Sequence, residues 1–211
     1  PRFVELAHDA ASGQLHPLKN TLGIARAAVA EGADVFENTV ANAISKTKNG
    51  YLVHTREGAV RCKFVLLAGN VYLDSLAPQI SSRIMPVGTY IVASEPMHRN
   101  RALSLIPSRA AICDTNFVLD YFRLSADERM IFGGRVSYST VTPINLAPSM
   151  RERMIAVFPQ LNDLKIEYAW GGFVDITMNR APDFGRLPAI GNDVYYLQGF
   201  SGHGLALTGI A

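Results

Sequence analysis

The chain has 211 residues, of which 48% are hydrophobic and 18% are charged. This length is enough for one sizeable or two modest domains with apolar cores. The net charge of +2 is too small, and the basic residues too scattered, for a nucleic-acid-binding surface. No apolar stretch approaches the ~20 residues of a membrane-spanning helix, and no signal-peptide pattern begins the chain. We therefore expect a soluble, cytoplasmic protein.

Cysteine and histidine usage gives no indication of a metal site. Cys62 and Cys113 fall in separate strand-like runs, and we expect two buried free thiols rather than a disulfide. The histidines outside the glycine-rich segment are too dispersed to share a metal ion: His8, His16, His54 and His98.

The first third of the chain predicts an α/β arrangement. Apolar residues recur at helical spacing from His16-Pro17 to Val29, and Gly32 suits the end of a helix. Short strand-like runs separated by Asn-Gly and Glu-Gly turns follow, at residues 34–37, 51–55, 59–63 and 64–68. The last run is continuously apolar, as in a strand covered on both faces. This order predicts the tail of an α/β nucleotide-binding domain.

After Pro78 the pattern becomes that of an antiparallel sheet. Strands are expected at residues 89–94, 111–115, 119–124, 130–136 and 165–176, with a helix over 148–158 and a short strand at 194–197. The predicted fold class is α/β plus α+β. The expected domains are a nucleotide-binding remnant (1–77), an antiparallel-sheet substrate domain (78–191) and a returning nucleotide-binding segment (192–211).

The most informative segment is Val194–Leu207, where an apolar strand leads into a glycine-rich turn and then a helix. Glycines allow positive φ and a close approach of the backbone to a ligand. The N-terminus of a helix offers unpaired N–H groups and a positive dipole. This segment could bind an electron-rich ring carbonyl or a phosphate, although a plain tight turn is the alternative, because the spacing departs from G-x-G-x-x-G.

Five stretches spread over the whole chain carry a resemblance: HPLK, VLLAGNVYL, MPVGTYIVASEP, YAWGGFVDITMNRAPDFGRL and QGFSGHGLALTG. In this order they resemble the D-amino-acid oxidase-like family of FAD-dependent oxidoreductases, which includes glycine oxidase and sarcosine oxidase. Within this family they resemble in particular the bacterial gamma-glutamylputrescine oxidoreductase branch. The resemblance implies an FAD/NAD(P)-binding α/β domain joined to an antiparallel-sheet substrate domain.

The resemblance also implies where FAD binds. Val40 resembles the strand that faces the adenine, and Ala68 and Gly69 resemble the strand end along the ribityl-pyrophosphate. Six consecutive residues resemble the family's loop over the pyrimidine side of the flavin: Gly199, Phe200, Ser201, Gly202, His203 and Gly204. Its N–H groups would stabilise negative charge on the ring. The histidine there is expected to pack or cap rather than to act in catalysis. With no Cys or His between Val174 and Gly185, non-covalent FAD is expected.

The family's N-terminal G-x-G-x-x-G unit has no counterpart in this sequence. The chain begins with Pro1, and Gly204–Ala211 looks like the opening of a helix without a stop. We therefore expect a fragment whose partner is the missing N-terminal part of the same polypeptide. Alone it should carry no stoichiometric FAD and be inactive, because each lost hydrogen bond to a charged group costs about 1.5–3 kcal/mol.

Three residues of the expected substrate domain are candidates for substrate contact. Tyr121 and Arg123 share one face of an expected strand, and Trp170 lies beside Gly171-Gly172, which leave room for a flat ligand. Ordinary structural roles are the alternatives for all three. No catalytic acid or base is assigned, because flavin accepts the hydride and the protein chiefly orients the substrate.

The substrate class depends on the residues after Phe173. Amino-acid oxidases of the family carry there an arginine that grips the substrate carboxylate, whereas this chain has Val174-Asp175. An aspartate would repel a carboxylate and attract an ammonium, so oxidation of an amine C–N bond, gamma-glutamylputrescine-like, is predicted. One alternative is a D-amino-acid or N-methyl/glycine-type amino-acid oxidase or dehydrogenase with Arg180 or Arg123 as the clamp. The other is a truncated, non-catalytic module that binds no flavin.

Overall fold

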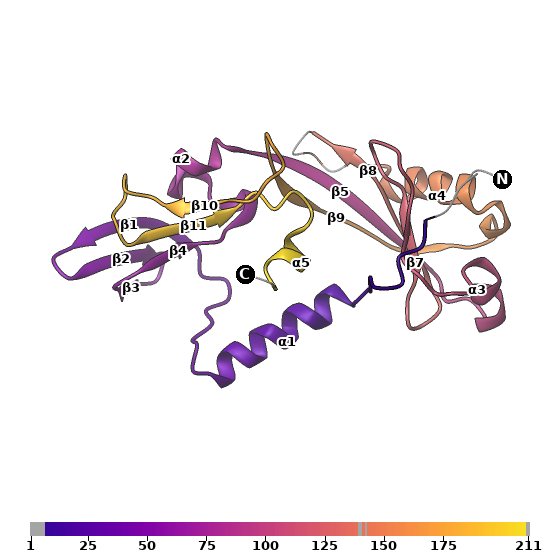
Figure 1. Cartoon of the computed structure of the whole chain (residues 1–211), viewed down its shortest axis with the longest axis horizontal. Helices are drawn as coiled ribbons and strands as arrows, with labels where there is room; N and C mark the ends of the chain where they lie inside the picture. The colour runs from indigo at the N-terminus through magenta and orange to yellow at the C-terminus, as the bar shows by residue number, and fades with distance from the viewer. Residues whose placement is uncertain (1–6, 139–140, 142, 210–211) are drawn as a thin grey trace. The chain divides into compact units, whose positions relative to one another are not determined.

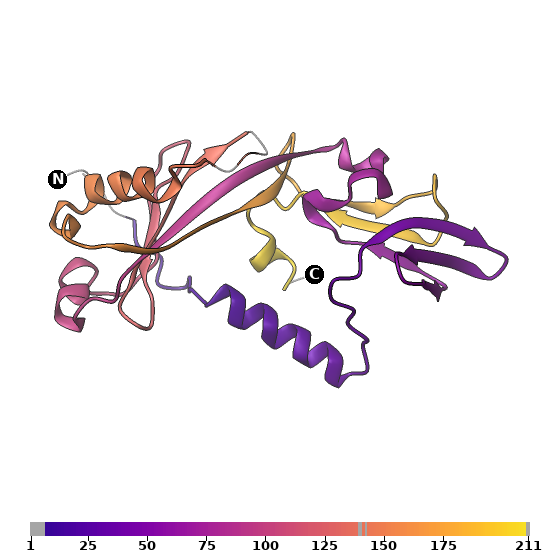
Figure 2. The same cartoon turned by 180° about the vertical axis from the view of Figure 1, so that it is seen from behind.

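The computed structural model describes residues 7–138, 141 and 143–209, and the chain forms two compact units (Figures 1 and 2). Unit 1 comprises Pro1–His16 and Val87–Phe173, and unit 2 comprises Pro17–Pro86 and Val174–Ala211. The mixed α/β and antiparallel fold class expected from the sequence is confirmed. The chain passes between the two units at 16/17, 86/87 and 173/174, and the segment before residue 192 contributes a strand to unit 2. The expected functional domains 1–77, 78–191 and 192–211 stay a prediction.

Unit 1 is built on a five-stranded sheet with the order β6-β7-β8-β5-β9. Its helices are α3 (Arg99–Leu105) and α4 (Leu146–Val157), and a 3-10 turn, η3 (Pro159–Leu161), follows α4. α4 begins before the expected Pro148, since proline is tolerated in a first helical turn, where its missing N–H would have no partner. The strands are β5 (Ile84–Ser94), β6 (Ile112–Cys113), β7 (Tyr121–Leu124), β8 (Met130–Ser137) and β9 (Ile166–Thr177).

Period-2 alternation places one face of this sheet in the core of unit 1. Phe122 of β7 and Phe132 of β8 are directly opposed in the ladder, and their rings stack with centroids 5.8 Å apart. Phe158 meets Phe122 edge-on at 4.9 Å. α4 covers the same core with fully buried methionines, and the main members are Tyr90, Val92, Phe122, Leu124, Met130, Phe132, Met150 and Met154.

Among its described residues, unit 2 contains two three-stranded sheets, three α-helices and two 3-10 turns. The first sheet is antiparallel in the order β1 (Ala41–Thr47), β2 (Gly50–Thr55), β3 (Ala59–Cys62). The second has the order β10 (Asp183–Arg186), β11 (Val194–Gln198), β4 (Val65–Leu67). The helical segments are α1 (Pro17–Ala30), η1 (Asn70–Tyr72), η2 (Asp74–Leu76), α2 (Pro78–Ser81) and α5 (Gly204–Leu207).

The pairing of β4 with β11 confirms that two apolar runs far apart in sequence share one sheet. β11 is parallel to β4 and antiparallel to β10. Tyr51 of β2 joins the same core, where its hydroxyl accepts a hydrogen bond from the Asp193 N–H at 3.2 Å. A Cβ at Gly191 would lie 2.1 Å from that hydroxyl, so only glycine allows this approach.

Two expectations about local structure are wrong. Residues 34–37 form no strand, since Val35 and Phe36 stay 58% and 66% exposed without a neighbouring strand. Both cysteines are free, as expected, but Cys62 is half-buried and Cys113 is exposed. Cys113 belongs to β6, a two-residue strand at the edge of its sheet, where little covers a side chain.

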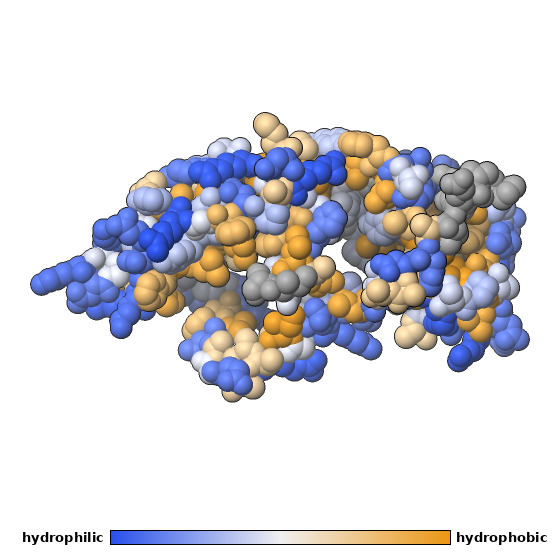
Figure 3. Space-filling view, viewed as in Figure 1, coloured by the Kyte–Doolittle hydropathy of each residue, from blue (hydrophilic) through white to orange (hydrophobic). Residues whose placement is uncertain are grey.

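Helix α1 buries none of its side chains, although it is apolar along one face. Leu18, Leu22 and Val29 are 62%, 49% and 52% exposed. Figure 3 shows hydrophobic side chains at the surface over this helix, mixed with polar ones. Within the described residues no helix is long and apolar enough to span a membrane.

Candidate functional site

The candidate site of unit 2 lies where two parallel strands end. β4 and β11 are in register from Val65 opposite Val194 to Leu67 opposite Tyr196. Their carboxyl ends therefore meet at one edge of the sheet, and ligands of open α/β sheets bind outside such ends. The structure thus brings together Ala68 and Gly69, which follow β4, and the loop Gly199–Gly204, which follows β11.

The loop after β11 has an unusual backbone. Gly199, Ser201 and Gly202 all have positive φ, at 75°, 52° and 87°. A Cβ on Gly199 would lie 2.3 Å from Thr177 Cγ2, so both its conformation and its surroundings require glycine. Ser201 is buried, and its Oγ donates to the Gly199 carbonyl at 3.2 Å.

Three backbone donors of this loop have no acceptor within the described part of the chain. They are the N–H groups of Phe200, Gly202 and Gly204. Backbone donors of this kind are usually satisfied by protein, water or ligand, and successive N–H groups in left-handed turns form anion-binding concavities. The loop can therefore donate to an electron-rich atom of a ligand.

Asp175, near the end of β9, holds this loop through two hydrogen bonds to its backbone. Asp175 is 8% exposed, and its Oδ2 accepts a hydrogen bond from the Gly199 N–H at 2.6 Å. The backbone carbonyl of Asp175 accepts from the Ser201 N–H at 3.0 Å. The carboxylate that was expected to attract a substrate ammonium is thus engaged with the protein backbone.

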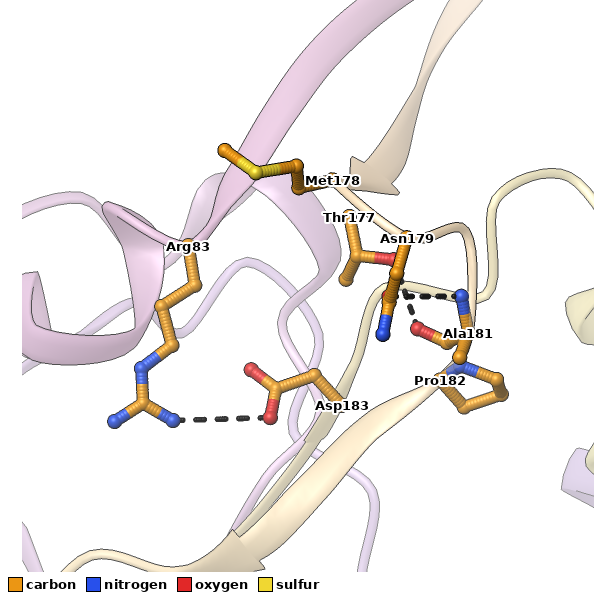
Figure 4. Close-up of a pocket in the computed structure, with 7 residues that line it drawn as sticks. All are labelled: Arg83, Thr177, Met178, Asn179, Ala181, Pro182 and Asp183. Carbon is orange, nitrogen blue, oxygen red and sulfur yellow. Dashed lines mark hydrogen bonds and ion pairs between the residues drawn. The ribbon is translucent and has the colours of Figure 1, made fainter.

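The turn that follows β9 borders a shallow pocket of about 380 Å³ (Figure 4). The Thr177 hydroxyl donates to the Ala181 carbonyl at 2.8 Å, and Asn179 Oδ1 accepts from the Ala181 N–H at 3.1 Å. Thr177 also contacts Gly199, so the pocket and the glycine-rich loop are contiguous. The lining residues are Arg83, Thr177, Met178, Asn179, Ala181, Pro182 and Asp183.

A polar network forms one wall of the pocket. Arg83 donates to the Tyr196 hydroxyl at 2.8 Å, and that hydroxyl donates to Asp183 Oδ1 at 2.9 Å. Burial, together with the Asp183 carboxylate, raises the pKa of Tyr196 above its usual value. Gln198 donates to the other Asp183 oxygen and to the Ile80 carbonyl. The network joins α2, β10 and β11 and keeps Asp183 fixed beside the pocket.

Sequence reasoning missed this network because its members are scattered along the chain. The available indication was Gln198, a polar residue at the end of the apolar run VYYLQ, since buried glutamine is uncommon without a partner. Asp183 follows a proline in a stretch that resembled a turn rather than a strand.

The substrate-contact candidates of unit 1 lie on the sheet face opposite the core. Tyr121 and Arg123 alternate with buried neighbours, which confirms that they share a face. The Tyr121 ring occupies the space over Gly133, where a Cβ would lie 2.0 Å from it, and burial raises its pKa. Arg123 donates to the Leu15 carbonyl and to the Gln14 side chain. Trp170 on β9 is 45% exposed.

The remaining candidates are at the surface of unit 2. Val40 is 76% exposed and directly precedes β1. Arg180 is exposed, has a φ of 60° and donates its N–H to the Thr177 carbonyl. His203 is the N-cap residue of α5, but its exposed side chain makes no capping hydrogen bond. Across residues 7–138, 141 and 143–209, no group of three or more His, Cys, Asp or Glu could hold a metal ion.

Parallel strand ends followed by a glycine-rich loop are features at which α/β folds bind cofactors. The family model described as "FAD dependent oxidoreductase" (DAO) matches residues 1–211. The chain therefore belongs to the DAO family of FAD-dependent oxidoreductases.

Curated relatives agree with this assignment. The chain is 42% identical over 209 residues to a probable oxidoreductase, OrdL, of Haemophilus influenzae, covering 96% of this chain and 46% of that protein. It is 37% identical over 211 residues to the gamma-glutamylputrescine oxidoreductase of Escherichia coli K12, covering 100% of this chain and 49% of that protein. The chain spans about half the length of these relatives.

Solved structures of low sequence identity share the fold. Glycine oxidase from Bacillus cereus superposes with a TM-score of 0.73 at 23% identity, covering 90% of this chain and 51% of that one. L-proline dehydrogenase from P. horikoshii gives a TM-score of 0.72 at 22% identity, covering 89% and 51%. The chain thus has the fold of these two enzymes.

Proposed function

We propose that the complete protein binds FAD non-covalently and oxidises the C–N bond of an amine of the gamma-glutamylputrescine type. The support for this substrate class is the 37% identity to a gamma-glutamylputrescine oxidoreductase over all 211 residues. The support for the cofactor is the family itself, together with a loop that fits it.

The residues at the edge of the β4–β11 sheet fit an FAD site. Phe200 and Gly202 offer N–H groups that have no acceptor among the described residues, and Gly199 lets the loop approach Thr177 more closely than a side chain would allow. Ala68 and Gly69 would lie along the cofactor at the end of β4. When bound, FAD supplies a hydride acceptor. In the proposed complete protein, residues outside these 211 would hold the pyrophosphate at a glycine-rich helix N-terminus.

The residues near the end of β9 favour an amine as the substrate rather than an amino acid. Val174 has no charge to offer, and the Asp175 carboxylate is buried against Gly199. Neither residue can pair with a substrate carboxylate. Arg123 is committed to Gln14 and Leu15 in unit 1. An α-amino acid would therefore lack the bidentate partner that such substrates need.

One observation favours the alternative of an amino-acid substrate. Arg180 is exposed in the turn whose neighbours Asn179 and Ala181 line the pocket. A guanidinium there could donate hydrogen bonds to a substrate carboxylate from the solvent side. Replacing Arg180 by Gln separates the two functions, because only the amino-acid reaction would lose its carboxylate partner.

The test is a substrate panel on the complete protein with bound FAD. Anaerobic mixing with gamma-glutamylputrescine, putrescine, glycine, sarcosine and D-alanine would be followed by loss of the flavin absorbance band. The proposal expects the largest kcat/KM for an amine, and R180Q unaffected. A preference for glycine, sarcosine or D-alanine that R180Q abolishes would establish the alternative instead.

Val174→Arg tests the same assignment by gain of function. A guanidinium at the end of β9 would create a bidentate partner for an α-carboxylate. We expect kcat/KM for the amino acids to rise relative to the amine by about tenfold or more, the factor that corresponds to about 1.4 kcal/mol. Val174→Leu is the matched control. An unchanged amine-to-amino-acid ratio in V174R would remove position 174 from the substrate site.

A further inference from the structure

Asp175 differs from an ordinary surface carboxylate because it is buried and bonded to the backbone of the glycine-rich loop. The residue is 8% exposed, lies on β9 and reaches Gly199, 24 positions further along the chain, at 2.6 Å. Its main-chain carbonyl binds the Ser201 N–H at 3.0 Å. One residue therefore holds the loop on both sides of Phe200.

The loop needs such support because its backbone is intrinsically unfavourable. Ser201 carries a side chain at a φ of 52°, between two glycines that also have positive φ. Residues in sparsely populated conformations persist only where surrounding contacts over-determine them. A hydrogen bond to a carboxylate is shorter and stronger than one between neutral groups. The Asp175 contacts thus supply a restraint that the loop's own sequence lacks.

We propose that Asp175 is a positioning residue for the cofactor loop. By holding the Gly199 and Ser201 N–H groups, it fixes the backbone so that the Phe200 and Gly202 N–H groups remain available to an electron-rich ligand. The identity of that ligand as FAD rests on the proposed function, whereas the positioning of the loop does not.

The buried charge has a second consequence. If FAD binds at this loop, the Asp175 carboxylate would disfavour added negative charge on the flavin, because a partly buried charge is weakly screened. It would then lower the reduction potential of the flavin, while its hydrogen bond to Gly199 fixes the loop. The two effects can be separated, because Asn keeps an acceptor oxygen and removes the charge.

The first measurement is amide hydrogen exchange in the complete protein, without added FAD, for wild type, D175A and D175N. In D175A the Gly199 amide should exchange about ten- to a hundredfold faster, as expected for loss of a hydrogen bond to a charged group. In D175N it should stay within about threefold of wild type. D114A is the matched control, since Asp114 Oδ1 accepts from the amides of Asn116 and Asp120 in unit 1. That variant should free those two amides and leave Gly199 protected.

The second measurement uses FAD as the probe. D175A should bind FAD more weakly, whereas D175N should bind it nearly as well and show a more positive flavin midpoint potential. If D175A does not fold, D175E provides the geometric test, because it keeps the charge but moves the oxygens by one methylene. Faster Gly199 exchange in D175E would then support the proposal.

The outcomes distinguish this inference from the proposed function. Accelerated Gly199 exchange in a complete protein that binds no FAD would end the flavoenzyme proposal and leave the positioning role standing. Unchanged Gly199 exchange in D175A, or a D175N enzyme whose only defect is a raised KM for the amine with an unaltered potential, would overturn the inference.

Discussion

The geometry of the candidate site requires glycine at position 199, where no Cβ can be accommodated. A methyl group there would meet Thr177 Cγ2 at 2.3 Å, and the φ of 75° disfavours any L side chain. We expect Gly199→Ala to lower the free energy of unfolding by about 1–3 kcal/mol and to weaken FAD binding. Gly172 has no atom within 4 Å of its added Cβ, so Gly172→Ala is the control. Urea denaturation of both variants would check this, and equal losses would refute it.

Tyr121 should make the stability of the protein depend on alkaline pH. Burial raises its pKa above the ordinary value of 10.0, so the folded state retains the phenolic proton more strongly than the unfolded state. This contribution is fully present below pH 10 and is lost as the pH rises through the folded-state pKa. Denaturation midpoints between pH 8 and about pH 11 should fall less steeply in Tyr121→Phe than in wild type. Parallel curves would contradict the assignment.

Among the elements, β8 is central to unit 1, because it lies between β7 and β5 and presents Phe132 to the core. The ring is 0% exposed and stacks on Phe122. Phe132→Ala should cost about 3–5 kcal/mol of unfolding free energy. Phe117→Ala, which removes a ring that is 81% exposed, should change it by only about 0.5 kcal/mol or less. Chemical denaturation would measure both, and a small loss in F132A would mean that the core repacks.

The elements that the sequence predicted correctly are those with a local cause. α1 follows from Pro17 at its start and Gly32 beyond its end, and β4 follows from its continuous apolar run. β10 was not foreseen, because Pro182 and Gly185 indicate a turn, and its strand forms only through pairing with β11. Propensity is overridden here by a tertiary contact.

The same division applies to the candidate site. The glycine-rich loop was predictable, since repeated glycines indicate backbone conformations with positive φ that other residues rarely adopt. The role of Asp175 was not, because its partner lies 24 residues away and an isolated carboxylate is equally suited to an ammonium. Arg83, Asp183 and Gln198 meet only after β10, β11 and α2 have assembled. No local pattern specifies such a network.

At the scale of the whole molecule, the chain spans about half the length of its curated relatives. We expect a protein that consists of these 211 residues alone to bind FAD more weakly than the complete protein. The reason is that, under the proposed function, pyrophosphate contacts would come from residues outside these 211. Each such charged hydrogen bond contributes about 1.5–3 kcal/mol. Titration of both proteins with FAD, followed by flavin fluorescence, would measure the difference. Equal affinities would show that the β4–β11 edge suffices.

The two free cysteines have a practical consequence, because they fall one in each unit. Cys113 is exposed on β6 of unit 1, and Cys62 is half-buried on β3 of unit 2. A thiol-reactive dye should therefore modify Cys113 rapidly and Cys62 slowly, since access governs the reaction of thiols with similar chemistry. Sequential labelling can then place a donor dye on one unit and an acceptor on the other without altering the sequence. Energy transfer between the two dyes would then measure the separation of the two labelled cysteines directly.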